Sequence, residues 1–187
     1  MSTIKVDAIR TRAGAVPKAS NVGLNVTGTI LQVQFLQIDT TVAQISVSAN
    51  TDTVVTQLTV NITPSSTSSI IRLDTHIFHE WANAAAPTEA AWYFYRDSTK
   101  LAASAAGSRS AGISMSKLSF HNDAGSTPEI ASYSYFDQPS STSQITYKVG
   151  VRNHYGTNFS FNRTINDSDN TQAERGISFI SATEIGG

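Results

Sequence analysis

The feature that most constrains the fold of this chain is a two-residue alternation of apolar and polar side chains, which recurs in short stretches from Thr29 onward. Residues 54–62 show it most clearly: the even-numbered positions are mainly apolar and the odd-numbered ones mainly polar, with Val55 as the exception. Because successive side chains of a strand point to opposite faces, this period predicts a strand buried on one face. A register slip of one residue would expose the apolar side chains to solvent, so burial of that face also fixes the register.

Similar stretches, separated by turn-forming sequences such as Pro64-Ser65-Ser66, predict strands along the rest of the chain. Besides residues 54–62, the expected strands are 29–38, 44–48, 71–77, 92–96, 113–121, 130–136, 145–152, 159–162 and 177–185. The one possible helix, at residues 84–91, is interrupted by Pro87, and a long loop fits equally well. Many short strands with almost no helix predict an all-β fold, an antiparallel β-sandwich. A jelly-roll-like arrangement is the first interpretation and another Greek-key sandwich is the alternative.

The first 28 residues differ from the rest in charge and in glycine and proline content, and we predict an extended N-terminal arm followed by a β-sandwich head at residues 29–187. Residues 1–20 hold four basic side chains against one acidic one, whereas residues 21–187 hold nine against thirteen. Two interpretations of the arm remain open: a flexible terminus, or a segment that becomes ordered against a partner subunit through a short strand at residues 3–9. For the second, the expected contact residues are Ile4, Lys5, Val6, Arg10 and Arg12.

The composition argues against several classes of protein. The chain has no cysteine, which rules out a disulfide scaffold, a thiolate metal site and a cysteine nucleophile. A net charge of -1 gives no general electrostatic basis for binding nucleic acid. No apolar run approaches the length of a bilayer span, so we expect no membrane insertion. The first twenty residues also lack an apolar stretch of signal-peptide length, and we therefore expect synthesis in the cytoplasm.

Residues that could carry metal or catalytic chemistry are scattered, and we predict no catalytic residue, no metal site and no cofactor. His76 and His79 are three residues apart, which on a strand places them on opposite faces; we expect the histidines to lie at the surface or to pack in loops. The stretch 166–170 gathers oxygen ligands but lacks the glycine and the distal glutamate of a calcium-binding hand. A connecting loop whose Asn and Asp side chains bond their own backbone is the preferred alternative, and ion binding there stays open.

Nucleophilic and acid–base arrangements are equally weak. Residues 112–116 lack the second glycine of a nucleophile elbow. Glu129 and Asp137 flank one expected strand, and nothing in the sequence suggests a shared cleft or a raised pKa. We expect a protein that is not an enzyme, although a glycan-cleaving enzyme stays open because its two carboxylates can lie far apart in sequence.

Aromatic residues cluster around the alanine-rich segment 83–91. On a strand, Trp92 and Phe94 point to one face, and Tyr93 and Tyr95 point to the other. One face belongs to the core; the second is either buried by a neighbouring subunit or exposed to a ligand such as a sugar. Tyrosine and tryptophan suit both roles because they combine a large apolar area with a polar tip. The candidate interface or glycan-contact residues are Trp81, Trp92, Tyr93 and Tyr95.

Short segments spread over nearly the whole chain carry a resemblance to a known group of proteins. In order, they are residues 2–9 (STIKVDAI), 28–33 (GTILQV), 58–71 (LTVNITPSSTSSII), 95–99 (YRDST), 141–149 (STSQITYKV), 162–164 (NRT) with Asp167 and 169–171 (DNT), and 180–185 (ISATEI). The most telling is the Pro-Ser-Ser-Thr-Ser-Ser turn at residues 64–69. In this order the segments resemble structural proteins of marine tailed phages, of the kind described as tail-fibre or virion proteins of cyanophages.

The resemblance implies a β-sandwich head, usually a homotrimer, mounted on the virion through its N-terminus, and it implies no catalytic residues. The expected function is that of a virion structural protein of a tailed bacteriophage, acting in the tail fibre, as a tail accessory or in host attachment. Its expected partners are copies of itself, other virion proteins contacted through the arm, and a glycan on the host surface. The first alternative is a capsid decoration protein of the cement or knob type. The second is a carbohydrate-binding module or a glycan-cleaving enzyme.

Overall fold

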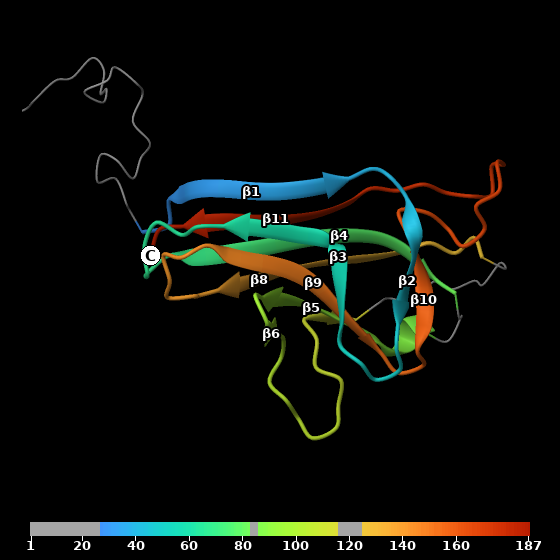
Figure 1. Cartoon of the computed structure of the whole chain (residues 1–187), viewed down its shortest axis with the longest axis horizontal. Helices are drawn as coiled ribbons and strands as arrows, with labels where there is room; N and C mark the ends of the chain where they lie inside the picture. Colours follow the sequence, from blue (N-terminus) through green and yellow to red (C-terminus); the bar gives the residue numbers. More distant parts are fainter. Residues whose placement is uncertain (1–26, 83–85, 116–124) are drawn as a thin grey trace, which may run out of the picture.

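A computed structural model describes residues 27–82, 86–115 and 125–187 (Figure 1). The chain forms an all-β fold whose strands agree closely with those predicted. The predicted arm contacts lie outside the described residues; they are Ile4, Lys5, Val6, Arg10 and Arg12. In chain order the elements are β1 (Ile30–Ile38), β2 (Val42–Val47), β3 (Thr53–Ile62), β4 (Ile70–Trp81), the 3-10 turn η2 (Ala86–Glu89), β5 (Ala90–Arg96), β6 (Thr99–Leu101), β7 (Ser114–Met115), β8 (Glu129–Asp137), β9 (Ile145–Asn153), β10 (Thr157–Phe161) and β11 (Ser178–Ile185).

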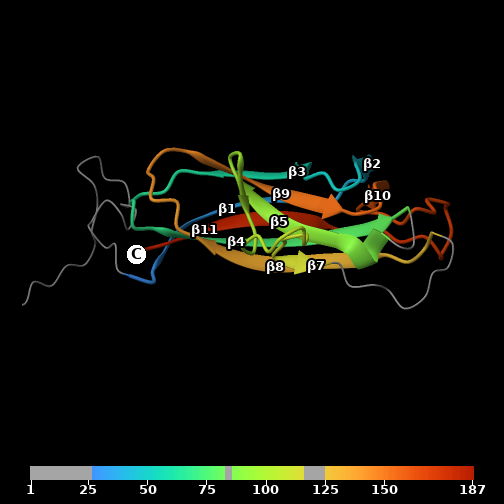
Figure 2. The same ribbon diagram turned by 90° about the horizontal axis from the view of Figure 1, so that it is seen from below.

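The strands form two antiparallel sheets that pack face to face. Sheet A has the order β1-β11-β4-β10-β2, with β8 on the other edge of β4. Sheet B has the order β3-β9-β5-β6, with β7 also paired to β5. In Figure 2, β3 and β9 of sheet B lie above β11, β4 and β8 of sheet A. The predicted antiparallel β-sandwich is therefore confirmed.

The connectivity is that of a jelly roll. β11 and β10 pair with successive parts of β4, and β1 and β2 pair with β11 and β10 in turn, so each couple occupies one strand position. β6 and β7 likewise share one edge of β5. The first couple, β1 and β2, thus pairs with the last, β10 and β11. Moving inward along the chain, β3 pairs with β9, β4 with β8, and β5 with the couple β6 and β7. This nested pairing of the first half of the chain with the second half is the double Greek key of a jelly roll.

The core lies between the sheets and is built from the apolar face of each strand. β4 shows the alternation well, since Ile71, Leu73 and Ile77 are fully buried while Arg72 points outward. Opposite them, Val149 and the other alternate residues of β9 fill the space from sheet B. Burial of one face per strand is the main source of stability in such a fold and the reason that the period of two predicted it.

Strand β3 departs from the predicted phase. The pairing with β9 jumps from Val55 opposite Val149 to Thr59 opposite Lys148, which marks a β-bulge. The bulge places Val55 in the core and Thr56 outside, whereas the alternation had placed Thr56 on the apolar face. Val55 was the exception in the pattern because a bulge resets which residues face inward.

Of two further expectations in the loops, the first is corrected and the second is described only in part. The possible helix at 84–91 is, within its described part, the single turn η2 followed directly by β5. The strand expected at 113–121 is described only as β7, because residues 116–124 lie outside the described residues. In the described parts of the chain, no helix has the length and apolar character that crossing a membrane requires.

Candidate functional site

Three of the four aromatic residues predicted to contact a subunit or a glycan are buried within the chain. Trp92 packs in the core against Trp81 and Phe159, with ring centroids 6.1 and 5.7 Å away. Tyr93, on the opposite face of β5, is also fully buried. The expectation that these residues meet a partner or a sugar is therefore wrong for Trp81, Trp92 and Tyr93. Tyr95 alone remains partly exposed.

The outer face of sheet B buries Tyr93 without any help from another subunit. The ammonium group of Lys100 lies 3.8 Å from the centre of the Tyr93 ring, and the ring of Tyr95 meets it edge-on at 5.5 Å. Below the ring lies Gly150, where even a Cβ atom would come within 2.3 Å of a Tyr93 ring carbon. A glycine in the neighbouring strand therefore makes room for the aromatic ring, and a long cationic side chain covers it.

A cluster of charges continues this surface. One carboxylate oxygen of Asp52, just before β3, accepts a hydrogen bond from Lys100 at 2.9 Å and lies 3.6 Å from the guanidinium of Arg152 on β9. Burial favours the neutral acid, but the hydrogen bond from Lys100, the nearby Tyr93 hydroxyl and the two positive charges outweigh it, so the pKa of Asp52 is lowered. Burial and the neighbouring Tyr95 and Asp52 raise the pKa of the Tyr93 hydroxyl.

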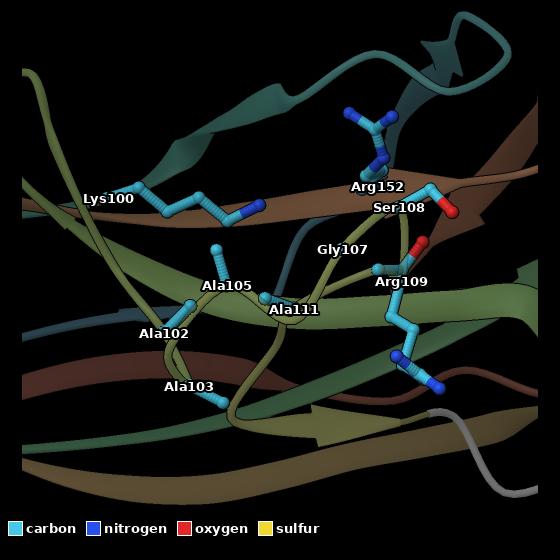
Figure 3. Close-up of a pocket in the computed structure, with 10 residues that line it drawn as sticks. Lys100, Ala102, Ala103, Ala105, Gly107, Ser108, Arg109, Ala111 and Arg152 are labelled. Carbon is cyan, nitrogen blue, oxygen red and sulfur yellow. The ribbon is translucent and has the colours of Figure 1, made fainter.

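A hollow of about 380 Å³ lies beside these charges, between the outer face of sheet B and the β6–β7 loop. The loop, yellow-green in Figure 1, extends from the edge of the sheet. Figure 3 shows that Lys100 and Arg152 approach the hollow from the sheet, while Arg109 on the loop points away from them. The remaining lining residues are small: Ala102, Ala103, Ala105, Gly107, Ser108, Ser110 and Ala111.

The charged cluster of Asp52, Lys100 and Arg152 was not predicted from the sequence. Asp52, Lys100 and Arg152 come from three separate strands or turns, and no local pattern links them. The pairing of β5 with β6 and β9, together with that of β3 with β9, brings them close to one another.

The outer face of sheet A differs in character, because it exposes large apolar side chains. On β1, the side chains of Ile30, Val33 and Phe35 point to this face and are half to three-quarters exposed. Ile130 and Phe136 do the same on β8, at the opposite edge. Polar residues of β4 and β11 separate the two apolar strips. A neighbouring hollow of about 450 Å³ near the start of β11 is lined by Gln37, His76, Phe78, Arg175, Gly176, Ile177 and Phe179.

His76 and His79 point to opposite faces of β4, as their spacing predicted. His76 lies on the outer face and bonds Ser132, with 2.8 Å between Nδ1 and Oγ. His79 is fully buried among Trp81, Trp92 and Phe159, which corrects the expectation of a surface or loop histidine. Among the described residues, no three His, Cys, Asp or Glu side chains gather closely enough to hold a metal ion.

His79 faces a second buried ionisable group, Glu129 on β8. Nδ1 of His79 lies 3.2 Å from the carbonyl of Ile77, and Nε2 lies 3.6 Å from Oε2 of Glu129. Burial, with a smaller effect of the Glu80 charge, raises the pKa of Glu129 to about 8. Burial lowers the pKa of His79 to about 4. At neutral pH both groups are therefore uncharged, and within the described residues neither Nε2 of His79 nor Oε2 of Glu129 has a hydrogen-bond partner. No local sequence pattern signals the raised pKa of Glu129.

This pair predicts a specific pH dependence of stability. Since the pKa of Glu129 is raised in the folded state, its proton stabilises the fold fully below about pH 4.5, and this contribution is lost as the pH rises toward about 8. We expect the Glu129→Gln variant to escape that loss. The difference in unfolding free energy between wild type and variant should shift by about 2–3 kcal/mol in favour of the variant between pH 6 and pH 8. Urea titrations at both pH values measure it, and a constant difference would contradict the raised pKa.

The loop at residues 166–170 follows the backbone-bonding alternative. The side-chain oxygens of Asn166 and Asn170 accept hydrogen bonds from the backbone N–H groups two residues later, at 3.2 and 2.9 Å. The carboxylate of Asp167 forms ion pairs with Arg163 and Arg175. Side-chain oxygens of Asn166, Asp167 and Asn170 are thus engaged within the chain.

No protein-family model matches the chain, and no curated protein matches it.

Proposed function

We propose that this protein is an oligomeric structural subunit of a tailed-phage virion, acting in the tail fibre, as a tail accessory or in host attachment. The segments that resemble phage structural proteins and the jelly-roll fold, which viral capsid proteins share with lectins, support this role. Because one fold can serve many functions, a role in assembly also requires a surface suited to contact with other subunits. The arm at residues 1–28, with its excess of basic side chains, is suited to guide docking onto an acidic neighbour.

The observation that carries the proposal is the unprotected strand β1. Its outer edge has no strand partner in the described part of the chain, and Phe35 is 73% exposed. Ile30 and Val33 extend the same apolar strip. An exposed edge strand of nine residues with large apolar side chains would invite uncontrolled pairing in a monomer, so natural proteins cover or charge such edges. Contact with copies of the same chain, in a trimer, would cover it.

Sedimentation of the purified chain at micromolar concentration tests the assembly. We expect a trimer for the wild type and a monomer for the Val33→Lys/Phe35→Lys variant, because lysine on an edge strand opposes pairing. Both chains should give the same far-UV circular dichroism. Phe136→Lys, which changes a 61% exposed aromatic residue at the opposite edge of sheet A, is the matched control and should remain a trimer. A monomeric wild type, or a double variant that still assembles, would contradict the role of β1.

Immunogold electron microscopy of phage particles tests the virion part. Labelling of the tail supports the tail-fibre or attachment role, and labelling of capsid faces or vertices would replace it with the decoration role. Absence of the protein from purified particles would refute both.

A further inference from the structure

We propose that the hollow on the outer face of sheet B binds a small ligand through an anionic oxygen group, a carboxylate or a sulfate such as an acidic sugar carries. The inference concerns a different surface from β1 and does not depend on the virion role. It rests on two cations that share one carboxylate, on the room beside them, and on the small residues of the β6–β7 loop.

The two cations are Lys100 and Arg152. Their side chains are 25% and 31% exposed, so each is partly shielded yet still reachable from solvent. Both contact the same oxygen of Asp52, which leaves the cluster with a net charge of +1. Partial burial strengthens the attraction of such a site for an anion, because the local dielectric constant is lower than in water.

Arg152 retains most of its hydrogen-bonding capacity. Within the described residues, its guanidinium makes the 3.6 Å ion pair with Asp52 and no hydrogen bond. A guanidinium offers five N–H donors in a planar fork that matches carboxylate and sulfate oxygens. Lys100, in contrast, already donates to Asp52 and stands over the Tyr93 ring, so its position is fixed. The anion would therefore be held mainly by Arg152, with Lys100 as a positioned charge.

The hollow suits a small ligand in size and lining. Its volume of about 380 Å³ lies at the lower end of the range of about 300–1,000 Å³ that ligand pockets span. The small alanine and glycine residues of the loop leave this space open, and Ser108 and Ser110 add hydroxyl groups to the wall. Polar hydroxyls beside a cationic pair fit a ligand that carries both hydroxyl and acidic groups.

Asp52 gives the proposal its sharpest test, because its carboxylate occupies the position that a ligand anion would compete for. Removing that charge with Asp52→Asn should strengthen anion binding by about three- to tenfold. If Asp52 and its two cations formed only a structural ion-pair cluster, the same change would leave anion binding unaltered.

The experiment is a titration of the full chain with sodium sulfate and, separately, with glucuronate at constant ionic strength, followed by amide chemical shifts. We expect saturable shifts near residues 100 and 152 with at least one of the two probes, and none with neutral glucose. Sulfate alone or glucuronate alone identifies which oxygen group the site prefers. Arg152→Gln should weaken binding about tenfold or more, and Lys100→Gln should weaken it less. Arg72→Gln, which changes a half-exposed arginine on the outer face of sheet A, should bind as the wild type does.

Several results would overturn the proposal. They are the lack of any saturable shift at 50 mM of either probe, equal binding by Arg152→Gln, or unchanged binding by Asp52→Asn. Circular dichroism melts of each variant show whether it folds. If Lys100→Gln fails to fold, because Lys100 covers Tyr93, the other two variants still decide the question.

Discussion

Replacing Trp92 by alanine is expected to lower the free energy of unfolding by about 3–5 kcal/mol. The indole is fully buried, and its ring lies 4.9 Å from His79 and 5.7 Å from Phe159 between centroids. Alanine would leave a cavity bounded by side chains from both sheets, which cannot collapse without moving the strands. Because small domains are stable by only about 5–15 kcal/mol, the loss is a large share of the total. Urea denaturation followed by circular dichroism measures it.

Tyr155→Ala is the matched control for this prediction. Tyr155 is an aromatic residue in the turn between β9 and β10 and is 46% exposed, so its loss should change stability by only about 0.5 kcal/mol. Similar losses for the two variants would mean that Trp92 is not a core residue. A Trp92→Ala chain that kept its stability but lost glycan binding would restore the original interpretation of this residue as a ligand platform.

Glu184→Ala is expected to destabilise the fold by a comparable amount, about 3–5 kcal/mol, because several buried donors lose their acceptor. This buried carboxylate accepts four hydrogen bonds: from the backbone N–H and the hydroxyl of Ser65, from the hydroxyl of Ser69, and from the amide of Gln32. Alanine removes the acceptor and leaves these donors beside an empty space. The carboxylate joins β1, β11 and the Pro-Ser-Ser-Thr-Ser-Ser turn, so its loss should loosen all three.

The pH dependence distinguishes this effect from simple loss of packing. Burial opposes ionisation of Glu184, but hydrogen bonds from Ser69, Gln32 and Ser65 outweigh it and lower the pKa. A carboxylate with a lowered pKa stabilises the fold above its ordinary pKa of about 4.5, and the contribution is lost as the pH falls further. Ser134→Ala, which removes an exposed hydroxyl bonded to Asp74, is a mild control. A Glu184→Ala chain as stable as that control at pH 7 would contradict the bonding network.

The sequence predicted the secondary structure well because nearly every strand has one buried face. β11 and β1 were expected at 177–185 and 29–38, within one residue of where they lie. The prediction failed where a local irregularity resets the alternation, as the bulge near Val55 does, or where a strand is too short to show a period, as β6 is.

Side-chain environments were harder to predict, since they depend on pairings between distant strands. The aromatic residues of β5 suggested a binding or subunit surface because both of its faces are aromatic. The structure instead covers Tyr93 with Lys100 and makes room for it at Gly150, and neither residue stands out in the sequence. Likewise, the raised pKa of Glu129 follows from its burial and from the charge of Glu80, which the pairing of β8 with the distant strand β4 brings near it.

The nested pairing of the strands has a consequence for how the chain folds during synthesis. Gln32 and Glu184, which bond each other across β1 and β11, are 152 residues apart in sequence. At a translation rate of about 5–20 residues per second, β1 leaves the ribosome on the order of ten seconds before its partner strand exists. The β5–β6 hairpin can form at once, whereas sheet A closes only after β11 has been synthesised, over long loops that slow folding. Throughout that interval β1 is free to meet the same strand of a neighbouring nascent chain.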